Sequence, residues 1–404
     1  MKLKLQFGYG MKSMSEHLAD VLPGTSVVLS PRDIDQDKAI SFAVKMRKNN
    51  GSVLLDPQVY ALSGSQDLKV VPKYDFWQHR EIKNIDWVEL VKRIHDINFQ
   101  LDSEVTILPA PYTKKIDSHY LHAQDAVAAA SGGSGRAVFM TLCLAPRVMS
   151  SEKDLTYLLS KVDDWDVDGY YVIPERPDGD YLTDDPLWMA NLLRLCAGLK
   201  LKGKQVIVGY ASHQLLSLSC AGVDAIASGT WMNVRSFTMD KFLAYSKRDY
   251  AKRKAWYYCP QSLSEFSVQY LDIAHARQKL SAMRPLIEKC IPYAGMLFNG
   301  LKPSLCSFNE SCAFKNYLVA LASQCEEVSQ GKSFSERYDR VIGLYRSAAE
   351  LLAFLHKYEI RGQSRDFEDY VDVSISALDM FKEDHGFLLD HMPQCYCDSN
   401  NVSA

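Results

Sequence analysis

Apolar residues in the first 235 positions gather in eight short runs, each of which ends at a turn rich in Gly, Pro, Asp or Glu and precedes a helical stretch. Two parallel strands need a helical crossover between them, so eight strand–helix units in a row predict a closed (β/α)8 TIM barrel. Barrels of this kind place their chemistry on the loops that follow the strands. The runs are residues 4–9, 26–30, 52–56, 104–109, 137–144, 168–173, 204–209 and 223–228.

Most of the connections between the runs contain a stretch with the periodicity of an amphipathic helix. One connection is oversized, because residues 57–103 separate the third run from the fourth. Apart from a helix near its end it is a long loop with aromatic residues, and loops of that length in compact domains are usually functional or disordered. The helices that we expect are residues 33–49, 87–99, 151–162, 186–199 and 213–221.

The pattern changes after residue 237. Helical periodicity dominates there, at 268–280, 314–328, 335–356 and 366–381. We therefore predict an α/β chain in which a barrel over residues 1–237 is followed by a mainly helical C-terminal domain or cap over 238–392. The last residues, 393–404, are small and polar and are expected to form a disordered tail.

Composition narrows the class of protein. The chain has 404 residues, with 47% hydrophobic and 24% charged residues, which is typical of a globular protein with more than one core. Its net charge of −3 gives no general attraction to polyanions, so a nucleic-acid site has to be a local patch. No apolar stretch approaches the roughly 20 residues of a membrane span. The ten cysteines are scattered, which favours reduced thiols and a cytoplasmic location over a disulfide framework.

Polar residues follow the strands at the end where barrel enzymes carry their chemistry. Asp56 and Glu175 come directly after the third and sixth runs. Paired carboxylates suit glycosyl transfer, in which one group handles the proton of the leaving group and another stabilises or attacks the sugar. They also suit recognition of the ring and amino N–H groups of a guanine-type base. Further candidates for substrate binding are Arg32, Gln58, Tyr60, Tyr210, His213, Asn233 and Arg235.

Each of these residues also has a structural interpretation. Asp56 precedes a proline and can simply form a turn. Asp33 can cap the following helix, and His213 can lie in the first turn of its own helix. Arg32 and Arg235 can bind phosphate or carboxylate, or can form ion pairs at the rim of the barrel.

Four short segments occur in an order that resembles a known family. Residues 52–62 read SVLLDPQVYAL, residues 171–177 read YVIPERP, residues 208–216 read VGYASHQLL and residues 314–318 read FKNYL. They resemble, in turn, the Asp-Ser-Gly-Gly-Phe-Gln, Val-Gly-Glu, Gly-Val-Gly-Thr-Pro and Arg-x-Tyr-Leu segments of tRNA-guanine transglycosylases. That superfamily comprises the queuine and archaeosine tRNA-ribosyltransferases and their relatives that act on DNA.

The resemblance implies exchange or modification of a guanine-type base, such as a 7-deazaguanine, in tRNA or DNA. It implies an acid–base or base-reading role for Asp56 and a base-recognition role for Glu175. The covalent nucleophile of the family is an Asp that follows a Gly-Ile-Asp element, where this chain has Ala227 after Gly-Val-Asp-Ala-Ile. Asp33 and Asp224 are the nearest acids that can replace it.

The zinc site of the family is not reproduced. Its Cys-x-Cys-x-x-Cys pattern, counted back from Tyr317, falls on Leu305, Ser307 and Glu310. The spacing therefore does not support a structural zinc, although it leaves one open, and no other cofactor is indicated. The cysteines nearest this segment are Cys306, Cys312 and Cys325.

Residues 247–258 combine five basic residues and one acid with four aromatic residues. Basic groups neutralise phosphates, and aromatic rings stack on unpaired bases. Because the segment follows the last run, we expect it near the end of the barrel that holds the site, where an extruded base can enter. The structural alternative is a solvated helix face. The candidate nucleic-acid ligands are Lys247, Arg248, Lys252, Arg253, Lys254 and Trp256.

Three functions follow from these observations. The first is a transglycosylase-like enzyme that acts on a polynucleotide. The second is a related subunit that has lost the nucleophile and only binds nucleic acid, as a partner in a homo- or hetero-oligomer. The third is an unrelated barrel enzyme that acts on a small anionic molecule, because one barrel fold serves many reactions.

Overall fold

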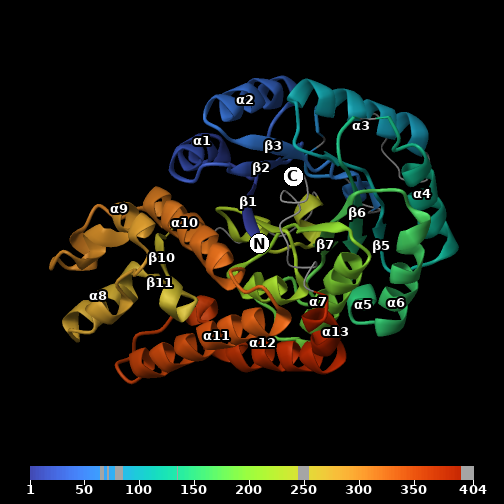
Figure 1. Cartoon of the computed structure of the whole chain (residues 1–404). Helices are drawn as coiled ribbons and strands as arrows, with labels where there is room; N and C mark the ends of the chain where they lie inside the picture. The colour runs from blue at the N-terminus through green and yellow to red at the C-terminus, as the bar shows by residue number, and fades with distance from the viewer. Residues whose placement is uncertain (64–67, 71, 78–84, 134, 244–253, 393–404) are drawn as a thin grey trace.

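The core of the protein is a curled sheet of eight parallel strands surrounded by helices (Figure 1). The computed structural model describes residues 1–63, 68–70, 72–77, 85–133, 135–243 and 254–392. All eight predicted runs are confirmed as strands of this sheet, in the order β3-β2-β1-β9-β8-β7-β6-β4. The strands are β1 Lys2–Gln6, β2 Ser26–Leu29, β3 Ser52–Leu55, β4 Thr106–Ile107, β6 Val138–Leu144, β7 Gly169–Pro174, β8 Gln205–Val208 and β9 Ala225–Ser228.

The sheet closes weakly between its two ends, β3 and β4. Glu104, two residues before β4, donates a backbone hydrogen bond from its N to Val53 O on β3 at 2.9 Å. The fourth strand is short because Pro109 and Pro111 have no N–H to give to a ladder. Pairing with β6 resumes beyond them at β5, Tyr112–Thr113. The fold is therefore a TIM-barrel-like α/β fold.

Helices cover the outside of the sheet close to the predicted positions. The helix predicted at 213–221 is a 3-10 helix over His213–Ala221. The α-helices of the barrel are α1 Met11–Val21, α2 Gln36–Lys48, α3 Trp87–Leu101, α4 Ser118–Ala129, α5 Pro146–Met149, α6 Glu152–Lys161 and α7 Pro186–Leu201.

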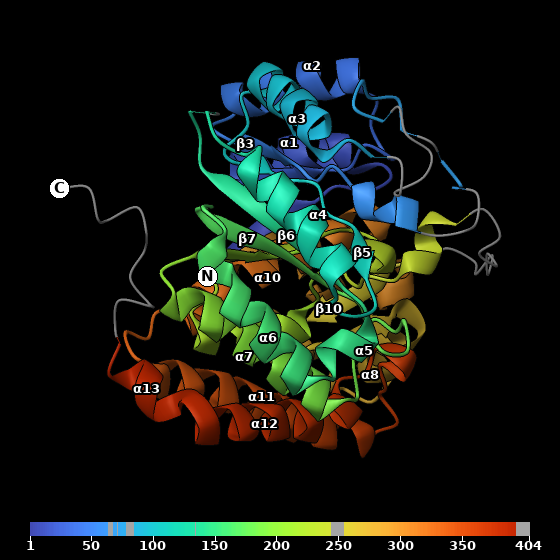
Figure 2. The same ribbon diagram turned by 90° about the vertical axis from the view of Figure 1, so that its right-hand side faces the viewer.

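The C-terminal segment packs against this barrel. Helix α10, Glu310–Val328, contacts β1 and α1 and thus occupies the position of an eighth barrel helix. Figure 2 shows α12, Glu368–Phe381, beside α11, Phe334–His356, and α12 also contacts α7. The boundary at residue 237 stays a prediction. The remaining elements are the hairpin β10 Trp256–Cys259 and β11 Ser264–Ser267, and the helices α8 Val268–Ala276, α9 Ile291–Ala294 and α13 Phe387–Asp390.

Alternate residues of each strand face the barrel interior. Lys4 and Ser26 are in register on β1 and β2, and their side chains meet Glu104 at 2.8 Å and 2.6 Å. Ala227 is in register with Lys4 and so faces the same interior. Asp56 follows Leu54 by two residues, which places its side chain inside the barrel at the opposite end. We call that end, where the carboxyl ends of the strands meet, the barrel mouth.

A buried carboxylate joins the barrel to the C-terminal segment. Glu265 on β11 is 2% exposed and pairs with Arg235 Nη1 at 2.9 Å and Arg365 Nη1 at 2.8 Å. Burial alone would raise the pKa of Glu265, but the two guanidinium groups hold that pKa below its ordinary value.

Within the described residues, no helix has the length and apolar character that a membrane crossing requires.

We predict that Glu265→Gln lowers the free energy of unfolding by about 3–5 kcal/mol, because it leaves the buried guanidinium group of Arg235 and the partly buried one of Arg365 without a counter-charge. Chemical denaturation measures this difference. Glu359→Gln, which breaks an exposed pair with Arg361, is the matched control and should change stability by about 0.5 kcal/mol or less. Equal stability of the two variants would contradict the prediction.

Candidate functional site

Asp56 is the centre of a buried polar cluster at the barrel mouth. Its carboxyl group is completely buried. Oδ2 accepts hydrogen bonds from the hydroxyl groups of Tyr60 at 2.7 Å and Tyr210 at 3.2 Å, and Oδ1 accepts one from Gln58 N at 3.0 Å. Burial raises the pKa of Asp56 from 3.8 to about 6, and these hydrogen bonds offset only part of that effect.

The backbone of two of these donors is strained. Gln58 and Tyr210 have φ values of 55° and 53°, in the left-handed region that residues with a Cβ rarely adopt. Such a conformation costs about 1–3 kcal/mol and is found mainly at functional sites. Gln58 and Tyr210 thus adopt a backbone conformation that their side chains disfavour, and in that conformation each donates a hydrogen bond to Asp56.

Gly209 leaves room for a further tyrosine, Tyr171, beside Asp56. The Tyr171 hydroxyl lies 3.5 Å from Asp56 Oδ2 and donates to Gln6 Oε1 at 3.1 Å. A Cβ atom at Gly209 would lie 2.4 Å from that same hydroxyl oxygen, so any side chain there would displace Tyr171. Asp56, Gln58, Tyr60, Tyr171 and Tyr210 together are called the mouth cluster below.

Lys241 approaches the mouth cluster from the segment that follows β9. It lies in the 3-10 helix Met239–Phe242, with Nζ 3.3 Å from the centroid of the Tyr210 ring. Burial, followed by the neighbouring charge of Arg32, lowers the pKa of Lys241 well below its ordinary value. Arg32 Nη1 donates to the carbonyl oxygen of Lys241 at 2.7 Å. Two basic groups therefore lie at this end of the barrel.

Glu175 lies at the same end, beyond β7. Its carboxylate accepts hydrogen bonds from the Tyr112 hydroxyl and from Met239 N, the latter at 2.7 Å. Burial raises the pKa of Glu175. Asp33 is connected to the mouth cluster through Ser30, whose hydroxyl lies 2.7 Å from Asp33 Oδ2 and 3.2 Å from Gln58 Oε1.

Asp224 lies at the end of the barrel opposite the mouth cluster. Asp224 comes just before the first residue of β9, whereas the barrel mouth lies at the other end of that strand, beyond Ser228. Its carboxylate pairs with Lys200 at 2.9 Å and accepts a hydrogen bond from Val206 N at 2.7 Å. Asp224 therefore stabilises the end of the barrel opposite the mouth.

The polar atoms of His213 and Arg235 that have partners are hydrogen-bonded to other groups of the protein. His213 is completely buried, and its Nδ1 lies 3.0 Å from the Tyr181 hydroxyl. Burial lowers the pKa of His213 to about 3, so the ring is neutral at pH 7. Arg235 donates to the carbonyl oxygens of Gly229 and Thr230 as well as to Glu265. Asn233 is exposed, and its carbonyl oxygen accepts a hydrogen bond from Lys241 at 3.2 Å.

The basic–aromatic segment is described only in part. Lys254 is exposed and Trp256 is half-buried at the start of β10. Lys247, Arg248, Lys252 and Arg253 lie outside the described residues. Within the described ranges no group of three or more His, Cys, Asp or Glu side chains is arranged to hold a metal ion.

Two residues of the site were not predicted as such. Tyr171 alternates with outward-facing residues on β7, so strand periodicity alone gives it an interior position. Lys241 has no comparable signal, because it lies beyond the last strand in a segment without periodicity.

No protein-family model and no curated protein matches this chain. Among solved structures, a xylose isomerase domain protein from Planctomyces limnophilus is similar at 12% sequence identity and a TM-score of 0.32, over 51% of this chain and 72% of that one. The carboxyl transferase domain of pyruvate carboxylase from Rhizobium etli is similar at 11% identity and a TM-score of 0.35, over 95% of this chain and 60% of that one. Similarity at this level does not bear on the substrate or the reaction.

We predict that Asp56→Asn stabilises the protein at high pH. The folded pKa of Asp56 is raised, so its contribution to stability is present below pH 3.8 and is lost as the pH rises through about 6. The stability of the variant relative to the natural protein should therefore increase by about 2 kcal/mol between pH 4.5 and pH 8.

Urea denaturation at the two pH values measures this difference. Asp372→Asn, at an exposed position of α12, is the matched control and should show no such increase. A relative stability of Asp56→Asn that is independent of pH would contradict the prediction.

Proposed function

We propose that the barrel mouth is an active site in which Asp56 transfers a proton, and that the substrate is a guanine-type base in a polynucleotide, either tRNA or DNA. The observation that supports this most strongly is the completely buried carboxyl group of Asp56, with a pKa of about 6. A carboxyl group with a pKa near the working pH can both give and accept a proton. The TIM-barrel-like fold is itself typical of enzymes with their site at this end.

The proposed reaction is base exchange at the anomeric carbon of the sugar. Asp56 gives its proton to the leaving base as the bond between that base and the sugar breaks. A carboxylate attacks the same carbon, and is displaced when the incoming base forms its bond and returns a proton to Asp56. Ala227 supplies no carboxylate, and Asp224 is at the other end of the barrel. Asp33 is the acid that we propose in this role, because it is connected to Asp56 through Ser30 and Gln58.

The remaining groups at the mouth suit recognition of the substrate. Glu175 accepts hydrogen bonds and can take the ring and amino N–H groups of a guanine-type base. Arg32 supplies positive charge for a phosphate group, and the amino group of Lys241 lies beside it as a further hydrogen-bond donor.

Two other functions each have an observation in their favour. Ala227 inside the barrel favours a related subunit that binds nucleic acid without catalysis. Arg32 and Lys241 beside the mouth cluster equally favour a barrel enzyme that acts on a small anionic substrate.

We expect the purified protein to incorporate labelled guanine, or a labelled 7-deazaguanine, into tRNA or duplex DNA. Asp56→Asn should lower the initial rate by 100-fold or more, since loss of a general acid–base group typically costs that much. Asp33→Asn should have a comparable effect, and Asp372→Asn should retain the full rate. Absence of incorporation into both polynucleotides by the folded protein would contradict base exchange and favour the binding subunit.

A further inference from the structure

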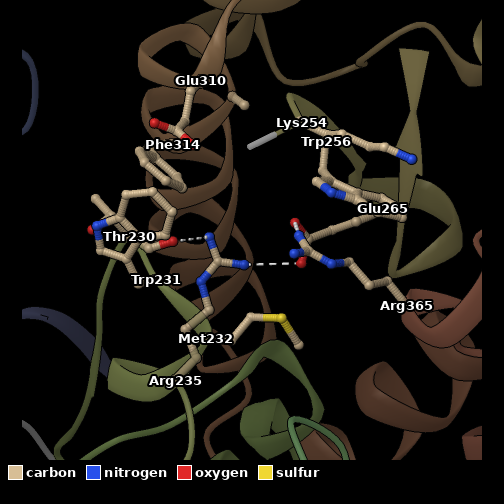
Figure 3. Close-up of a pocket in the computed structure, with 11 residues that line it drawn as sticks. Thr230, Trp231, Met232, Arg235, Lys254, Trp256, Glu265, Glu310, Phe314 and Arg365 are labelled. Carbon is tan, nitrogen blue, oxygen red and sulfur yellow. Dashed lines mark hydrogen bonds and ion pairs between the residues drawn. The ribbon is translucent and has the colours of Figure 1, made fainter. Parts of the chain in front are cut away.

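A second pocket, here called the rim pocket, opens between the loop after β9 and the C-terminal segment (Figure 3). It has a volume of about 50 Å³. Residues 230–232 line one side, β10 and Arg365 line the other, and the first turns of α10 close the top. Its floor is the buried pair of Arg235 and Glu265.

Aromatic rings form two opposite walls of the rim pocket. Trp231 and Phe314 pack edge to face on one side, with their ring centroids 4.9 Å apart. Trp256 lies on the other side, and the guanidinium group of Arg365 lies 4.3 Å from its ring centroid. All three aromatic residues are half-buried. A planar group between two such walls gains stacking energy from either side.

The charges around the rim pocket favour an anion. Arg235, Arg365 and the exposed Lys254 line it, against the carboxylates of Glu265 and Glu310. Both arginines pair with Glu265, which leaves Lys254 as the lining cation with no ion pair within the described residues. The N-terminus of α10, a helix of 19 residues, adds the positive end of its dipole.

A buried hydroxyl group in the lining has no partner. Thr230 is 4% exposed, and its Oγ1 makes no hydrogen bond within the described part of the chain. A hydroxyl group that has lost its water without gaining a partner costs free energy.

We propose that the rim pocket binds one unpaired nucleotide of the polynucleotide substrate, beside the nucleotide that enters the barrel. The base stacks on Trp256 and presents N–H groups to Glu310, and its phosphate lies at Lys254. Strands β9, β1, β2 and β3 are consecutive neighbours in the sheet, which places the loop after β9 about 14 Å from the end of β3, within reach of a few nucleotides. The inference rests on the proposed function only in taking a polynucleotide as the substrate.

The test uses the full chain and single-stranded 12-nucleotide DNA and RNA that carry 5-iodouracil and a fluorescent label. We expect photo-crosslinks to Trp256, Trp231 or Phe314, located by mass spectrometry. Trp256→Leu should weaken binding about tenfold, the loss of one base stack. Phe314→Leu serves the same purpose if Trp256→Leu does not fold.

Salt dependence measures the phosphate contact. Lys254→Gln should reduce the slope of log K against log salt by about 0.7, the value for one phosphate of a single strand. Lys289→Gln, at an exposed position of the C-terminal segment, is the matched control and should leave the slope unchanged. An equal slope in all three proteins would overturn the proposal, as would crosslinks confined to other residues.

Two further results separate this inference from the proposed reaction. Crosslinks in the rim pocket without guanine incorporation would uphold the pocket and contradict base exchange. Guanine incorporation that is unaffected by Trp256→Leu and Lys254→Gln would uphold base exchange and contradict the role of the rim pocket. Tight binding of a free nucleoside monophosphate that the oligonucleotide does not displace would also overturn the proposal, because the pocket would then serve a small molecule.

Discussion

The two candidate sites depend on one buried carboxylate. Glu265 lies between Arg235 and Arg365, and the two guanidinium groups together with a hydrogen bond from the Tyr181 hydroxyl offset the cost of burying its charge. Arg235 fixes the start of the segment that carries Lys241 over the barrel mouth, through the carbonyl groups of Gly229 and Thr230. Arg365 fixes the ring of Trp256. The positions of the mouth cluster and of the rim pocket are therefore coupled through this single interaction.

The mouth cluster is built at a cost to stability. An ionised Asp56 without a solvent contact destabilises the folded chain at neutral pH, and the left-handed backbone of Gln58 and Tyr210 adds strain. Gly209, which follows the neighbouring strand β8, leaves space for the ring of Tyr171. A barrel selected for stability alone would fill this interior with apolar side chains, so the cluster is best understood as a site that the rest of the fold supports.

Strand periodicity was sufficient to predict all eight strands and to place Asp56 at the mouth, because both depend on local pattern and on the direction of the chain. An ion pair of Arg235 was one of the two roles expected from the sequence, but its partner Glu265 and the position of Lys241 were not predictable, since they depend on a hairpin and a 3-10 helix that pack from outside the barrel. Of the two acids proposed from the sequence as replacement nucleophiles, Asp33 lies near the mouth cluster and Asp224 lies at the other end of the barrel. The prolines that interrupt the fourth strand gave a signal in the sequence that was missed.

The most direct test of this account is the pKa of Asp56 itself. Titration of the protein with ¹³C-labelled aspartate carboxyl groups by NMR, with Asp56→Asn to assign the resonance, measures it without knowledge of the substrate. The account predicts a midpoint near pH 6. A midpoint at or below pH 4 would mean that Asp56 is an ordinary ionised carboxylate at neutral pH, and would contradict its role in proton transfer.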